Sequence, residues 1–198
     1  MSDRSSSKLN DYALVIDWET TGLNAEIHLG IEIAAAVVDR MSWKVLEVFQ
    51  TYVFFDKDRY VWEDAAEKVH GISQVFLAGE GIAQEEARSE FVRFIRKYWT
   101  ITDPVLQVSH NVPFDRGFTE QLLGGHEAAV KEITWYHYYL DTAQIGLALC
   151  GNAKSDVVFA EINRSKKRGY HSAVEDVHSC VYILQTVKEA WREYQLSR

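Results

Sequence analysis

The sequence predicts an α/β fold in which helices flank one mixed β-sheet, and two observations carry this prediction. Apolar runs of strand length, rich in β-branched residues, crowd the first third of the chain. Beyond them, a short apolar strand alternates with segments whose apolar residues recur at helical spacing. Strands first and strand–helix alternation afterwards are typical of a mixed sheet covered by helices.

The elements follow from the local pattern in chain order. The expected strands and helices are strands over 12–16, 31–38 and 45–55, helices over 64–70 and 87–98, a strand over 105–108, a helix between Asn111 and Gly124, a short strand over 138–140, a helix over 142–149, and a closing helix from Ser172. The first three strands form a meander. Asn111 is placed to cap its helix, and Gly124-Gly125 to end it.

Length and composition favour a cytoplasmic protein. They also predict a flexible tail over residues 1–10 and a single domain over residues 11–198. No apolar run reaches the length needed to span a bilayer, which predicts no membrane partner, and the polar start lacks a signal-peptide core. Cys150 and Cys180 form no CxxC pair, which predicts two buried free thiols in a reducing compartment.

A net charge of −8 argues against nucleic acid as a partner unless several acids bind cations. A local basic run does exist at Arg164, Lys166, Lys167 and Arg168. A solvated loop and a segment that guides a nucleic-acid strand are both open interpretations of it.

Asp17 and Glu19 end the first predicted strand. Residues two apart on a strand point the same way, so both carboxylates share a face while Trp18 faces the opposite side. Two acids on one face could equally be solvated charges. The Thr20-Thr21-Gly22 turn that follows favours a ligand, because glycine permits close backbone approach and hydroxyls can donate to phosphate.

Asp115 falls in the first turn of a helix that follows a strand. An acid favoured by the helix macrodipole would explain it alone. His110 and Asn111 beside it are more than a simple cap requires, and Asn111 could both cap the helix and touch a substrate.

His171 and Asp176 are five residues apart, a spacing that would turn them about 140° from one another on one helix. Ser172 to Glu175 matches a capping box, which predicts Ser172 as the N-cap. His171 then sits just outside the helix, free to swing over a site. A purely structural histidine is the alternative.

Four carboxylates in one place would repel by roughly 3 kcal/mol per pair at about 5 Å. Two divalent cations offset four negative charges, and oxygen ligands favour Mg²⁺ or Mn²⁺ over zinc. Two such ions suit an in-line displacement at phosphorus, and a histidine with an ordinary pKa near 6.5 suits the removal of a proton from water.

Three motifs resemble the DEDDh, or DnaQ-like, 3′–5′ exonucleases of the ribonuclease H-like superfamily, a group that includes the epsilon proofreading subunit and ribonuclease T. They are Asp17-x-Glu19-Thr-Thr-Gly-Leu, His110-Asn111-x-x-Phe114-Asp115 and His171-x-x-x-x-Asp176, and a Val69-His70-Gly71-Ile72 segment resembles a fourth. The resemblance implies a five-stranded ribonuclease H-like sheet and an exonuclease acting at the 3′ ends of single-stranded DNA or RNA.

By that resemblance, Asp17, Glu19 and Asp176 would hold one metal ion, Asp17 and Asp115 a second, and His171 would be the general base. The residues expected to bind the terminal nucleotide are Thr20, Thr21, Gly22, Leu23, His70, His110, Asn111 and Phe114. The long tail by which epsilon subunits hold a polymerase is absent, so a stand-alone enzyme is favoured over a polymerase-bound one. An RNA-trimming enzyme and an inactive nucleic-acid-binding module are the alternatives.

Overall fold

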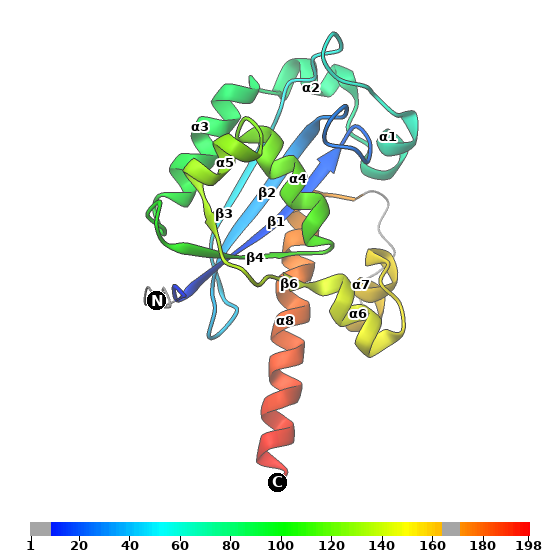
Figure 1. Cartoon of the computed structure of the whole chain (residues 1–198). Coiled ribbons are helices and arrows are strands. Elements are labelled where there is room, and N and C mark those ends of the chain that lie inside the picture. The colour runs from blue at the N-terminus through cyan, green and yellow to red at the C-terminus, as the bar shows by residue number, and fades with distance from the viewer. Residues whose placement is uncertain (1–8, 164–170) are drawn as a thin grey trace.

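The computed structural model describes residues 9–163 and 171–198, built around a twisted sheet (Figure 1). The predicted tail over 1–10 falls largely on residues 1–8, which lie outside the described residues. The basic run over 164–168 lies outside them as well.

Every predicted element has a counterpart in the structure, although the strand predicted over 138–140 meets β6 only at Leu140. The helices and strands are β1 (Tyr12–Thr20), β2 (Gly30–Asp39), β3 (Val45–Tyr52), α1 (Asp64–His70), α2 (Gln74–Glu80), α3 (Gln84–Ile95), β4 (Pro104–Ser109), α4 (Val112–Leu122), α5 (His126–Glu132), β5 (Thr134–Trp135), β6 (Leu140–Asp141), α6 (Thr142–Cys150), α7 (Ser155–Asn163) and α8 (Ala173–Leu196). Four of them, α2, α5, β5 and α7, were not predicted. The predicted helix over 64–70 has the bounds of α1.

The sheet is mixed, in the strand order β3-β2-β1-β4-β5, and β6 also pairs with β4. The pairs β1–β2 and β2–β3 are antiparallel, as the predicted meander requires, whereas β1 and β4 run parallel. Both short strands lie parallel to β4, β5 beside Pro104–Val105 and β6 beside Val108–Ser109. The predicted five-stranded sheet is therefore confirmed, with its fifth position divided between two short strands.

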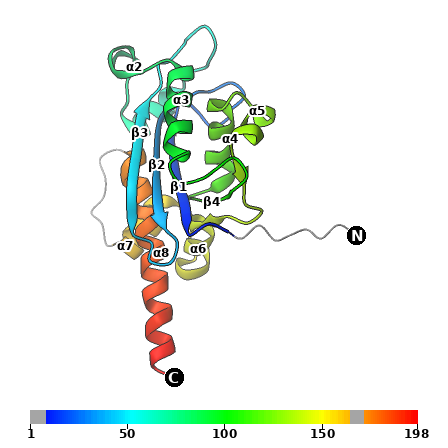
Figure 2. The ribbon, with the colours of Figure 1, turned by 90° about the vertical axis from the view of Figure 1, so that its left-hand side faces the viewer.

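Each face of the sheet has its own apolar core. Leu14, Ile16 and Trp18 of β1 pack with residues of α3 and α4, whereas Ala13 and Val15 pack with residues of α8. Figure 2 shows α4 and α5 on one side of the strands and α8 on the other. Because side chains alternate along β1, Asp17 and Glu19 lie on the same face as Ala13 and Val15, the face that α8 covers.

Helix α8 packs on the sheet only through its first half. Val177, Val181 and Leu184 are buried, while the C-terminal half continues beyond the sheet and its Trp191 is exposed (Figure 1). The thiol prediction is half wrong: Cys180 is buried, but Cys150 is exposed because it ends α6 on its solvent side. Among residues 9–163 and 171–198, no helix combines the length and apolarity needed to cross a membrane.

Candidate active site

Strand β1 carries the first two acids of the site. Glu19 is buried and Asp17 half-buried, on the face of β1 that α8 covers, and Trp18 is buried against the other face. The alternation predicted for these three residues is confirmed. The Trp18 indole Nε1 donates to Thr119 Oγ1 at 3.0 Å, and Thr119 in turn donates to the Asp115 carbonyl at 2.7 Å. The bulky middle residue of the motif thus ties β1 to the helix that carries Asp115.

Asp115 lies in the first turn of α4 and is 2 % exposed. Its Oδ2 is buried without a hydrogen-bond partner among the described residues. Burial holds the pKa of this carboxyl well above its ordinary value, against hydrogen bonds from the Trp18 backbone and the Ser109 side chain that lower it. A buried carboxylate oxygen without a hydrogen-bond donor beside it is available to bind a cation.

Asp141, which the sequence analysis overlooked, caps the helix of Asp115. Asn111 occupies the N-cap position, but its φ of 82° is left-handed and its side chain makes no capping bond, so that prediction was wrong in its chemistry. Instead, the Asp141 carboxylate accepts from the backbone N–H groups of Asn111 and Val112 at 3.1 and 3.2 Å, and from Ala143 of α6 at 2.9 Å. One buried acid therefore satisfies the N-termini of two helices. Gly124 and Gly125, both at a φ of 93°, follow the end of α4 as predicted.

His110 has protein partners at both ring nitrogens. Its Nδ1 lies 3.0 Å from Thr142 Oγ1, and its Nε2 lies 2.8 Å from the Ala153 carbonyl oxygen. A carbonyl oxygen can only accept, so Nε2 carries the proton. These contacts hold the end of β4 to α6 and to the loop that leads into α7.

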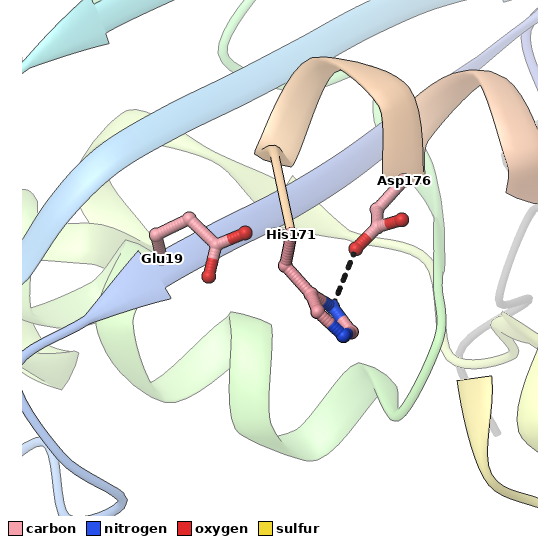
Figure 3. A group of neighbouring side chains, drawn as sticks. All are labelled: Glu19, His171 and Asp176. Atoms are coloured by element: carbon pink, nitrogen blue, oxygen red, sulfur yellow. Dashed lines mark hydrogen bonds and ion pairs between the residues drawn. The ribbon is translucent and has the colours of Figure 1, made fainter. Parts of the chain in front are cut away.

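His171 precedes α8, as predicted, but it is held in place rather than free to swing. Its backbone N–H donates to the Val69 carbonyl at 3.0 Å. Its Nδ1 lies 3.2 Å from Asp176 Oδ2 (Figure 3), and its Nε2 lies 3.2 Å from Asp156 Oδ1. Ser172 is the N-cap residue of α8, yet its side chain makes no capping hydrogen bond.

The five predicted catalytic residues meet in one cavity of about 110 Å³. Its lining residues are Asp17, Trp18, Glu19, His110, Phe114, Asp115, Ser155, Phe159, His171 and Asp176. They come from the ends of β1 and β4, the start of α4, α7 and the start of α8. Residues that are far apart in the chain therefore converge at one end of the sheet.

The donor set of the cavity fits a divalent cation. One ligand atom each from Glu19, His171 and Asp176 lie within 4.8 Å of one another, and Figure 3 shows their side chains converging. Asp17 and Asp115 add carboxylates to the same cavity. An oxygen-rich set with one imidazole and no thiolate suits Mg²⁺ or Mn²⁺ better than a structural zinc ion.

Two of the residues predicted to bind the nucleotide, His110 and Phe114, line this cavity, and the other six are not among its lining residues. Thr20, the last residue of β1, is buried, as are Thr21 and Gly22 in the turn that follows, whereas Leu23 is 80 % exposed. A Cβ at position 22 would lie 2.5 Å from the His28 ring, so a contact within the protein already explains this glycine. Asn111 is exposed and lines a neighbouring hollow of about 500 Å³, which shares His110 and Ser155 with the central cavity.

His70 ends α1 and is buried. Its Nδ1 accepts from the Ile72 N–H at 3.0 Å, and its Nε2 is buried without a hydrogen-bond partner among the described residues. Burial lowers the pKa of the ring to about 4, so the ring is neutral at pH 7.

Helix α7 supplies the residues of the cavity that sequence reasoning missed. Ser155 and Phe159 line the cavity, and Asp156 contacts His171. Asp141 had a readable signal, an acid directly before a predicted helix. The residues of α7 had none, because the helix itself was not predicted.

The fold and the cavity together fit a phosphodiester hydrolase, and the family match shows that the chain is one. A family model described as Exonuclease, RNase_T, matches residues 14–184, and the chain belongs to this family, the DEDDh or DnaQ-like 3′–5′ exonucleases.

Three relatives that match most of this chain bear different names. The chain is 30 % identical to a DNA polymerase III subunit epsilon of Buchnera aphidicola from Acyrthosiphon pisum, over 87 % of this chain and 72 % of the relative. It is 25 % identical to an oligoribonuclease of the same organism, over 95 % and 98 %, and 27 % identical to a ribonuclease T of Vibrio parahaemolyticus, over 90 % and 82 %.

Solved structures support the fold. A complex of E. coli exonuclease I with a dT13 oligonucleotide matches with a TM-score of 0.73 at 16 % identity, over 93 % of this chain and 43 % of that one. The chain thus spans less than half the length of exonuclease I. The nuclease domain of 3′hExo, a DEDDh family member bound to rAMP, matches with a TM-score of 0.69 at 14 % identity, over 93 % and 95 %.

Proposed function

We propose that the cavity is a two-metal site that removes nucleotides from the 3′ ends of single-stranded DNA or RNA. The observation that carries this proposal is the convergence of Asp17, Glu19, Asp115, His171 and Asp176 on one small cavity. A module kept only for binding would be expected to have lost at least one of these residues, and none is missing.

Each residue has a distinct role in this proposal. Asp17, Glu19 and Asp176 would hold the first ion, and Asp17 with Asp115 the second, Asp115 partly through water. Bound Mg²⁺ or Mn²⁺ would offset the clustered negative charge and stabilise the attacking and leaving oxygens. The His171 imidazole would take the proton of the attacking water. The segment from Thr20 to Leu23, with His70, His110, Asn111 and Phe114, would position the terminal nucleotide.

The oligonucleotide bound to exonuclease I supports a single-stranded substrate, and the relatives favour neither sugar. One is a subunit of a DNA polymerase and two bear the names of ribonucleases, at similar identities. Among the solved structures, one carries a dT13 oligonucleotide and another carries rAMP. DNA and RNA are therefore the two arms of the experiment that tests the proposal.

The experiment follows 3′-labelled single-stranded DNA, single-stranded RNA and duplex DNA in Mg²⁺, with and without a chelator. Label should be released from at least one single-stranded substrate, and the chelator should stop the release. Asp17→Ala should abolish release, whereas Asp58→Ala, which removes an exposed loop carboxylate, should not. If wild-type protein releases no label from DNA or RNA, the enzyme proposal fails and the binding module is favoured.

A further inference from the structure

Glu32 is a buried acid of β2 to which the proposed reaction gives no role. It is 2 % exposed and lies directly opposite Glu19 in the antiparallel pairing of β1 with β2. Directly opposed residues of two strands point to the same face of a sheet, so Glu32 shares with Glu19 the face that α8 covers. Ala34, two residues further along β2, packs in the same core as Val177 of α8. A buried acid thus stands beside a candidate metal ligand without lining the cavity.

The carboxylate of Glu32 joins the sheet to the first residue of α8. Its Oε1 accepts from the Gln50 side-chain Nε2 of β3 at 2.5 Å. Its Oε2 accepts from the backbone N–H of Ala173 at 3.5 Å. Both oxygens of this buried acid therefore have a donor, one from a strand and one from the helix.

The N-cap residue of α8 does not supply an acceptor for the first turn. Ser172 occupies that position, and its side chain makes no capping hydrogen bond. The first N–H groups of a helix have no partner within the helix, so an acceptor must come from elsewhere. Glu32 supplies it, as Asp141 does for α4, and it places a carboxylate at the positive end of the helix macrodipole.

The residues around Ala173 include two of the five proposed catalytic residues. His171 precedes Ala173 by two residues, and Asp176 lies three residues beyond it, in the first turn of α8. The His171 backbone N–H donates to the Val69 carbonyl of α1. The segment is therefore held by α1 at one point and by β2 at another, and β2 pairs with the strand that carries Glu19.

We propose that Glu32 is a positioning residue of the active site: it accepts the Ala173 N–H and so fixes the first turn of α8 against the sheet. One ligand atom each of Glu19, His171 and Asp176 lie within 4.8 Å of one another, and this anchor keeps that spacing. The inference rests on the proposed function, in which Glu19 and Asp176 hold a metal ion. Groups that orient metal ligands are typically worth about 10- to 100-fold in metal affinity or activity.

The kinetic experiment compares wild type, Glu32→Leu and Glu32→Gln on a 3′-labelled single-stranded oligonucleotide in Mg²⁺. Leucine fills a similar volume without an acceptor, and we expect kcat to fall about tenfold with KM within about twofold. Glutamine keeps an amide oxygen that can accept the Ala173 N–H, so its kcat should stay within about threefold of wild type. A kcat within twofold of wild type in Glu32→Leu, or an equal loss in Glu32→Gln, overturns the proposal.

Glu47→Gln is the matched control for the loss of an acid from the sheet. Glu47 lies in β3, and its hydrogen bonds go to Lys97 and Tyr98 instead of α8. Its kcat and KM should stay within about twofold of wild type, and a loss equal to that of Glu32→Leu overturns the proposal. If circular dichroism shows that Glu32→Leu does not fold, Glu32→Asp replaces it, because a side chain one methylene shorter cannot reach both donors.

Two measurements without turnover separate this inference from the proposed function. Hydrogen exchange of the Ala173 amide, recorded without metal, should be faster in Glu32→Leu than in wild type, while the amides of β1 keep their protection relative to global unfolding. The Mn²⁺ dissociation constant, measured by calorimetry, should rise about tenfold. Unchanged exchange at Ala173, or an unchanged dissociation constant, overturns the proposal even if the enzyme is active. If both change while wild type releases no label, the positioning role stands and the nuclease proposal fails.

Discussion

Gly30 of β2 leaves the space that the Trp18 indole fills: a Cβ at position 30 would lie 2.5 Å from the ring. Trp18 stands between the two acids of β1 and donates to Thr119, which bonds the Asp115 carbonyl. Gly30, which has no side chain, thus makes room for Trp18. Through Trp18, β1 holds α4, and with it Asp115, at the cavity.

Gly30→Ala should therefore disturb the site from a distance. Overpacking of a core costs about 1–3 kcal/mol, and here the indole must move to relieve the contact. We expect the free energy of unfolding to fall by about that amount in urea titrations, and exonuclease activity to fall with it.

Gly79→Ala is the matched control for that variant. Gly79 lies inside α2, and a Cβ there would meet nothing within 4 Å. Alanine should stabilise the helix by about 0.5–1 kcal/mol and leave activity unchanged. If Gly30→Ala behaves like Gly79→Ala, the packing of Trp18 is not what holds α4.

Asp141→Ala should loosen the starts of two helices at once. Its carboxylate accepts from Asn111, Val112 and Ala143, and loss of an N-cap costs about 0.5–2 kcal/mol. Hydrogen exchange should become faster at the amides of Val112 and Ala143 together, while the amides of β2 keep their protection relative to global unfolding. Faster exchange at only one of the two helices would contradict the shared cap.

His70 should make stability depend on pH in the mildly acidic range. Its folded pKa of about 4 lies below the ordinary 6.5, so the unfolded chain binds the proton more tightly. The contribution of the neutral ring to stability is complete above about pH 6.5 and is lost as the pH falls toward 4, by about 3 kcal/mol in total.

The measurement for His70 is the free energy of unfolding from pH 7.5 to 4, compared with His70→Asn. Asparagine keeps an acceptor for the Ile72 N–H but does not titrate in this range. The difference between the two curves should change with pH below about 6.5. Parallel curves would show that this ring does not gain a proton on unfolding.

His171→Ala should separate a general base from a metal ligand. Loss of a general base costs about 10²- to 10⁴-fold in rate. We expect a fall of that size in single-turnover hydrolysis, while the Mn²⁺ dissociation constant measured by calorimetry changes little. A large loss of Mn²⁺ affinity would instead make His171 a ligand, which its position beside Glu19 and Asp176 also allows.

The sequence predicted the parts of this site that depend on local periodicity. Strand alternation was enough to place Asp17 and Glu19 on one face, because each neighbour along a strand reverses direction. The cap of α4 could not be predicted in this way, since its acceptor, Asp141, is about thirty residues away in the chain. The role of each aromatic residue was hidden for the same reason: Phe91 is buried and Trp191 is exposed, although both occur in apolar helical patterns.

Anomalous diffraction from crystals soaked in Mn²⁺ is the most direct test of a two-metal site, because it locates bound ions independently of turnover. A two-metal site predicts two Mn²⁺ peaks in the cavity between β1, α4 and α8, with Asp17, Glu19, Asp115 and Asp176 as ligands. Asp115→Asn should lose the peak beside position 115 and keep the other. Peaks elsewhere on the protein, or a cavity without Mn²⁺ at millimolar concentration, would contradict a two-metal site.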